Sequence, residues 1–130
     1  MNLLLDTHTL IWALEDSPRL PLYIRELIVD TSNKIYVSAV SFWEIAIKHK
    51  KSQELMPYTA DQIKTFCQRA GYIFLSIGID SISTYEKNDF SMHSDPFDQM
   101  LVAQSQCNNM RLITHDSKLK LFGLGFIELF

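Results

Sequence analysis

Cysteine is scarce in this chain. Cys67 and Cys107 are its only two cysteines among 130 residues. Two cysteines so far apart fit neither a zinc motif nor a dense disulfide framework. Both lie in stretches with helical patterning, so we expect buried free thiols, as in a reducing cytosol.

Long hydrophobic runs and an excess of positive charge are also missing. No apolar run is long enough to span a membrane, and Asp6 interrupts the apolar start before it could form a signal peptide. We therefore expect a cytoplasmic protein without a membrane partner. The formal net charge of −3 argues against a protein wrapped in nucleic acid, although a local basic patch could still guide a phosphate backbone.

What the chain does have is a regular alternation of short apolar strands and helical stretches. Strands are expected at 2–5, 35–37, 72–77, 111–113 and 126–130; helices are expected at 7–14, 22–28, from Ser38 or Ser41 onward, from Thr59 or Asp61 to 69, at 80–87 and at 97–108, with a helical turn at 116–121. This alternation predicts one α/β domain over residues 1–130, with a central parallel sheet and helices on both faces. In such sheets, ligands bind outside the carboxyl ends of the strands.

Acidic side chains stand at strand ends and helix starts, where ligands are expected. The acids concerned are Asp6, Glu44, Asp95, Asp98 and Asp116. Each has a structural explanation: a helix cap for Asp6, Asp95 and Asp116, a surface pair with Lys48 for Glu44, and the helix dipole for Asp98. Together they would repel one another unless protons or cations neutralise them. The set therefore predicts a pocket of oxygen ligands for Mg²⁺ or Mn²⁺.

Other side chains near these acids have two possible roles. The Thr114 hydroxyl could orient a water molecule or a phosphate oxygen. The basic stretch Lys48, His49, Lys50 and Lys51 is either a solvated helix C-terminus or a contact for nucleic-acid phosphates. Trp12, Phe42 and Trp43 are expected in the core.

Asp6 could also be the aspartyl nucleophile of a phosphotransferase of the haloacid-dehalogenase type. Such sites usually carry a second Asp two residues on, as their acid–base. Here that position holds His8, which weakens the phosphatase hypothesis considerably.

Four blocks make the chain resemble PIN-domain ribonucleases and, more narrowly, the VapC-like toxins of bacterial type II toxin–antitoxin pairs. They occur in the family's order, and the similarity covers nearly the whole chain; the blocks are Leu4 to His8, Ser38 to Lys48, His93 to Asp98, and Leu112 to Asp116. The sequence departs from the family at Gln99, where Arg is common. It departs again at Lys50 to Leu55, where a Gly-Lys-Leu segment is common.

The resemblance implies a PIN-like, Rossmann-like fold and a metal-dependent endoribonuclease that cuts RNA with metal-activated water. Asp6, Glu44, Asp98 and Asp116 correspond to the family's acidic quartet, which holds one or two Mg²⁺ or Mn²⁺ ions, with Asp6 and Asp98 as the expected direct ligands. Asp95 and Thr114 correspond to an outer shell.

The resemblance also implies a homodimer and a cognate antitoxin that covers the site. Two alternatives stay open. One is a PIN-type nuclease for RNA processing without a toxin role. The other is a non-catalytic PIN domain that binds RNA or a protein partner.

Overall fold

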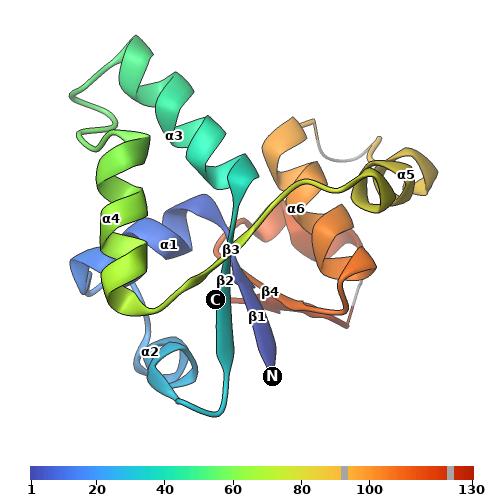
Figure 1. The fold of residues 1–130 in the computed structure, drawn as a ribbon. Helices are drawn as coiled ribbons and strands as arrows, with labels where there is room; N and C mark the ends of the chain where they lie inside the picture. The colour runs from blue at the N-terminus through green and yellow to red at the C-terminus, as the bar shows by residue number, and fades with distance from the viewer. Residues whose placement is uncertain (92–93, 123–124) are drawn as a thin grey trace.

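The computed structural model describes residues 1–91, 94–122 and 125–130; His93, part of the third block, lies outside them. A five-stranded parallel sheet with the order β3-β2-β1-β4-β5 forms its centre (Figure 1). The strands are β1 (Asn2–Leu5), β2 (Lys34–Ser38), β3 (Ile73–Leu75), β4 (Arg111–Thr114) and β5 (Ile127–Leu129). The predicted parallel α/β architecture is confirmed.

Helices cover both faces of the sheet, as predicted. They are α1 (Thr7–Glu15), α2 (Leu22–Val29), α3 (Ala39–Lys51), α4 (Ala60–Ala70), α5 (Ile79–Lys87) and α6 (Pro96–Cys107), followed by the 3₁₀ helix η1 (Ser117–Phe122). In Figure 1, α1, α3 and α4 stand on one side of the strands and α5 and α6 on the other. Within the described residues, no helix is both long enough and apolar enough to cross a membrane.

The central strand β1 is buried on both faces. Leu3 and Leu5 belong to the core under α1, α2 and α4, whereas Leu4 belongs to the core on the α6 side. All three leucines have no exposed surface, and burial of each stabilises the fold by about 1.5–3 kcal/mol. This explains why β1 is a continuous apolar run rather than an alternating one.

Side-chain caps determine where two of the helices begin. The Ser38 hydroxyl accepts a hydrogen bond from the Val40 amide and so starts α3, which resolves the choice between Ser38 and Ser41. Thr59 and Gln62 form a reciprocal capping box at the start of α4. The same helix ends at Gly71, whose φ of 79° lies in the left-handed region that glycine adopts without steric cost.

Three sequence predictions about these elements are corrected. The edge strand β3 is shorter than the predicted 72–77, because β2 alone pairs with it. Cys107 is a free cysteine as expected but is exposed, at the last residue of α6, whereas Cys67 is buried as expected and burial raises its thiol pKa to about 11. Trp43 is 61% exposed rather than in the core, because neighbouring helix positions are turned by about 100° from each other and Glu44 and Ile45 take the inward positions.

The order of strands places a topological switch point between β1 and β4. The chain runs outward from β1 to β2 and β3, then returns to lay β4 on the other side of β1. The Asp6 amide extends this pairing by donating to the Ile113 carbonyl at 3.1 Å. Open α/β sheets bind ligands at such a point, and Asp6 and Asp116 both follow strands that border it.

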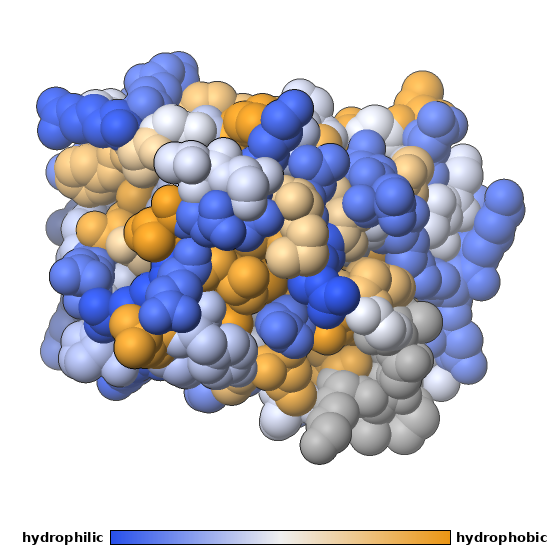
Figure 2. Space-filling model, turned by 90° about the horizontal axis from the view of Figure 1, so that it is seen from below, coloured by the Kyte–Doolittle hydropathy of each residue, from blue (hydrophilic) through white to orange (hydrophobic). Residues whose placement is uncertain are grey.

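Figure 2 shows the molecule from below, on the side where β1 begins in Figure 1. Orange apolar side chains are interleaved there with blue hydrophilic ones. The concentration of acids described next lies at the opposite, carboxyl ends of the strands.

Candidate functional site

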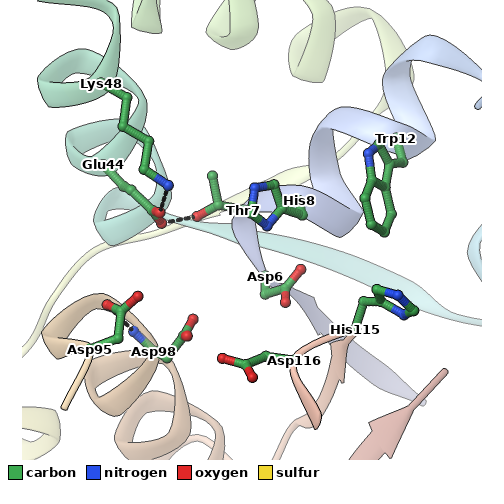
Figure 3. A pocket seen from close by; sticks show the side chains of 10 residues that line it. All are labelled: Asp6, Thr7, His8, Trp12, Glu44, Lys48, Asp95, Asp98, His115 and Asp116. Atoms are coloured by element: carbon green, nitrogen blue, oxygen red, sulfur yellow. Dashed lines mark hydrogen bonds and ion pairs between the residues drawn. The ribbon is translucent and has the colours of Figure 1, made fainter. Parts of the chain in front are cut away.

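A cavity of about 240 Å³ opens at the carboxyl ends of β1 and β4 (Figure 3). It contains all five acids that the sequence singled out, contributed by four separate segments of the chain. The lining residues are Asp6, Thr7, His8, Trp12, Glu44, Lys48, Asp95, Asp98, His115 and Asp116.

Asp6 is both a helix cap and a wall of the cavity. Its Oδ1 accepts a hydrogen bond from the Thr9 amide at 2.8 Å, and its Oδ2 accepts one from the Thr114 hydroxyl at 2.6 Å. Asp6 is only 5% exposed and Thr114 is fully buried. The Thr114 hydroxyl is therefore tied to Asp6, and Thr114 is not among the residues that line the cavity.

Thr114→Val is expected to destabilise the protein by about 1–3 kcal/mol, because a buried carboxylate oxygen loses its partner. Urea unfolding measures this change, and Thr114→Ser, which keeps the hydroxyl, should retain most of the stability. Equal stability of the Val variant and the parent would contradict this role of Thr114.

Glu44 comes from the inward face of α3 and is 5% exposed. Its Oε1 accepts a hydrogen bond from the Thr7 hydroxyl at 2.6 Å, and its Oε2 lies 2.5 Å from the Lys48 ammonium. Ser41 lies behind this pair, 3.0 Å from the same Thr7 oxygen. The expected pair of Glu44 with Lys48 is therefore present, but at the cavity and not at a simple solvent-facing surface.

Asp95, Asp98 and Asp116 form the other wall. Asp95 caps α6 by accepting from the amides of Phe97 at 2.9 Å and Asp98 at 3.4 Å, with Pro96 in the first turn as predicted. Burial raises the pKa of Asp98 to about 8, with further contributions from a hydrogen bond with Asp116 and from the charges of Asp95, Asp6 and Asp116. A carboxyl group with this pKa favours its protonated form at neutral pH, because its ionisation in a buried site among other acids is unfavourable.

The carboxylate oxygens of this cavity suit a hard cation, but the side chains do not converge on one position. Among the residues that the structure describes, no three His, Cys, Asp or Glu side chains are placed to hold a metal ion. The raised pKa of Asp98 favours its protonated form, and the Lys48 ammonium is paired with Glu44. Asp6, Asp98, Asp116 and Glu44 are the side chains that could hold Mg²⁺ or Mn²⁺.

Sequence reasoning did not assign a role to several lining residues. Thr7, His8 and His115 were not expected in the site, although each directly adjoins an acid in sequence or follows one within two positions. Adjacency to a strand-end acid was the available signal. Of the basic stretch, Lys48 lines the cavity, whereas Lys50 and Lys51 are exposed at the end of α3.

The structure also shows the surroundings of Gln99, where the sequence departs from the family, and of His8, where it departs from the phosphatases. Gln99 is buried, and its side-chain oxygen accepts a hydrogen bond from the Tyr85 hydroxyl of α5 at 3.2 Å. The position that would hold the second Asp of a phosphatase is the exposed His8. The phosphatase alternative thus gains no support from the structure.

The fold and the cavity together define a class: a Rossmann-like α/β protein with an acidic pocket at its switch point. The chain matches the PIN domain family over residues 3–123 and belongs to that family.

Solved structures share this fold across the whole chain. VapBC2 from Rickettsia felis, bound to a DNA fragment from its promoter, has a TM-score of 0.69 at 14% identity and covers 100% of this chain and 98% of its own. VapBC-1 from nontypeable Haemophilus influenzae has a TM-score of 0.68 at 17% identity, covering 99% and 98%. DNA-bound VapBC from Salmonella typhimurium has a TM-score of 0.63 at 17% identity, covering 100% and 97%. No curated protein sequence matches the chain at a significant level.

Proposed function

We propose that this protein is a metal-dependent endoribonuclease and the toxin of a type II toxin–antitoxin pair. The observation that carries the proposal is the cluster of Asp6, Asp98 and Asp116 at the switch point of a PIN fold. The cavity is acidic, and its Thr7 and Lys48 side chains are tied to Glu44, so it suits a divalent cation and, through it, a phosphodiester.

In this proposal, Asp6, Asp98, Asp116 and Glu44 hold Mg²⁺ or Mn²⁺, with Asp6 and Asp98 as direct ligands. The ion supplies positive charge at the scissile phosphate and a nucleophilic water at neutral pH. Thr114 fixes the orientation of Asp6, and Asp95 fixes the first turn of α6, which carries Asp98. Lys48 stands beside Glu44, where its ammonium can meet an RNA phosphate.

A cognate antitoxin in the cytoplasm is the proposed protein partner, and residues 1–130 are proposed to act as one PIN domain. The solved structures that share the fold are VapBC complexes, and a further one, from Klebsiella pneumoniae, is described as a toxin–antitoxin complex. Their names describe those proteins, and the shared fold supports the same assembly here.

Cleavage of a mixed RNA pool tests the proposal, with Mg²⁺, with Mn²⁺ and with EDTA. We expect cutting with either ion and none with EDTA. RNA binding without cutting, in the presence of bound metal, would favour the non-catalytic alternative. Cutting by a protein that has no antitoxin reading frame beside its gene would favour the RNA-processing nuclease.

Lys50 and Lys51 allow a test of how RNA reaches the cavity. Changing both to Ala should lower the slope of log affinity against log salt concentration by about 0.7 for each RNA phosphate that these lysines neutralise. Fluorescence anisotropy of a labelled RNA across a salt series measures the slope. Lys64→Ala, an exposed change on α4, is the control; an unchanged slope in the double variant would make these lysines only a solvated helix end.

A homodimer is the proposed assembly, and exposed apolar side chains on α3, β3 and α5 support it. Trp43, Phe74, Ile79 and Ile82 are 61%, 44%, 81% and 48% exposed. Trp43 packs edge-on against Phe97 at 5.4 Å between ring centres, beside a small apolar cavity. Apolar groups of this kind often mark an interface.

Trp43→Glu is therefore expected to convert the dimer into a monomer, because a charge would be buried without a partner. Sedimentation equilibrium measures the mass of the assembly. Leu55→Glu, at an 82% exposed position after α3, should leave the dimer intact. If both variants form dimers as readily as the parent does, the interface lies elsewhere.

A further inference from the structure

Aromatic and imidazole rings gather at one side of the acidic cavity. His8 and Trp12 of α1 are nearly parallel, with ring centres 5.8 Å apart and planes 21° apart. His115, which follows β4, meets the edge of Trp12 at 5.5 Å, and Phe130 packs against both of these rings. In Figure 3, Trp12 and His115 lie to the right of Asp6, His8 lies above it, and Asp95 and Asp98 lie to its left.

These rings are available to a ligand. His8 and His115 are exposed, and Trp12 is half-buried: it packs on the core under α1 and also lines the cavity. The His115 ring nitrogen Nδ1 is hydrogen-bonded to the Phe130 carbonyl, which fixes that ring in place. Contacts with neighbouring groups thus keep these rings in defined positions on the surface.

The charge on this side differs from that of the acid wall. The Arg19 guanidinium lies 5.7 Å from the centre of the Trp12 ring, in a cation–π contact. The opposite side carries the carboxylates Asp95 and Asp98. One side of the cavity thus suits a cation, and the other presents π faces, imidazole nitrogens and a guanidinium.

We propose that His8, Trp12 and His115 form a stacking subsite for a nucleobase of single-stranded RNA, next to the phosphodiester held at the acids. The inference rests on the proposed function, because a base arrives here only if an RNA phosphate occupies the acidic cavity. Every base has a π face, so the subsite takes bases with little preference for sequence. A single sugar joins the base to its phosphate, which matches rings and acids that share one cavity.

His8→Ala tests the subsite, because His8 is exposed and its loss leaves the core intact. Binding of a short fluorescein-labelled RNA of mixed sequence is measured by anisotropy, with Ca²⁺ in place of Mg²⁺ to prevent cutting. We expect about 5- to 100-fold weaker binding, the range for loss of one stacked base. His8→Phe should bind within a few-fold of the parent, and Tyr23→Ala, at an exposed aromatic on α2, should bind like the parent.

The fluorescence of Trp12 provides a second readout, which leaves Trp12 itself in place. Trp12 and Trp43 are the only tryptophans, so Trp43→Phe leaves Trp12 as the sole tryptophan emitter. We expect RNA to quench this emission, and an abasic sugar–phosphate strand of equal length to quench it much less.

The outcomes separate the subsite from the nuclease. Metal-dependent cutting by the parent, with His8→Ala unchanged in affinity and Trp12 unquenched, would overturn the subsite and leave the nuclease standing. Neither binding nor cutting of RNA by the parent would overturn both. Unchanged RNA affinity with loss of a co-purifying protein from His8→Ala would overturn the RNA assignment and give the rings to a protein partner.

Discussion

Asp6→Asn is expected to abolish RNA cleavage and most of the rise in melting temperature that Mg²⁺ gives the parent. Asp6 sits at the centre of the cavity, and its two oxygens are oriented by Thr9 and Thr114. Loss of side chains that merely orient metal ligands usually costs 10–100-fold, so loss of a ligand itself should cost at least about 100-fold in activity. A saturating ion at about 100 times its Kd stabilises a fold by about 2.7 kcal/mol, or about 10 °C for a domain of this size.

The Asn variant separates this effect from misfolding. Asparagine is as good a helix cap as aspartate, so its side-chain oxygen can still accept the Thr9 amide, and its amide nitrogen can donate to the Thr114 hydroxyl oxygen. Melting without metal should therefore change little, while the metal-dependent shift disappears. Asp80→Asn, at an exposed acid in the first turn of α5, is the matched control. An Asp6→Asn protein that cuts RNA as fast as the parent would refute the assignment of the acids.

The metal-free protein is expected to lose stability as the pH rises from about 4 to about 8. The pKa of Asp98 is raised from 3.8 to about 8 by burial and by its acidic neighbours. Between these values the folded state holds a proton that the unfolded state has released, so unfolding is favoured as the pH rises. Above about pH 8, Asp98 is ionised in both the folded and the unfolded state, so it no longer makes the stability depend on pH.

Melting scans across pH, with EDTA and with Mg²⁺, measure this dependence. Asp98→Asn removes the titrating group, so its metal-free stability should be flatter over the same pH range. Mg²⁺ should stabilise the parent more at pH 8 than at pH 5, because the ion competes with the proton. A parent that becomes more stable without metal between pH 5 and pH 8 would contradict the raised pKa.

The acids that follow the strand ends are the part of the site whose position could be predicted from the sequence. The apolar runs of β1 and β4 predict these strands from sequence, and in a parallel sheet both strands end at the same edge. Asp6 follows β1 directly and Asp116 comes two residues after β4, so their meeting at one cavity follows from local patterning and a general rule. Caps were equally local: Asp95 before Pro96 was predicted from its neighbours, and Thr59 was one of the two residues, with Asp61, predicted to begin α4.

The positions on α3 could not be assigned in this way. Trp43, Glu44 and Ile45 are adjacent, and helical spacing alone does not say which of them faces the sheet. Packing decides it: Ile45 enters the core, Glu44 enters the cavity, and Trp43 is left outside. The contact between Thr7 and Glu44, which are 37 residues apart, depends on how α1 and α3 cross, and no local pattern contains that information.

The Lys48–Glu44 pair has a consequence for how the cavity is filled. The chain carries its own tethered cation at 2.5 Å from a carboxylate, and the raised pKa of Asp98 favours a protonated acid on the opposite wall. The divalent ion proposed for this cavity would therefore displace an ammonium group from Glu44 rather than fill a site of bare negative charge. Its uptake would be an exchange of one cation for another, and the strength of the Lys48–Glu44 pair would set how much free metal that exchange needs.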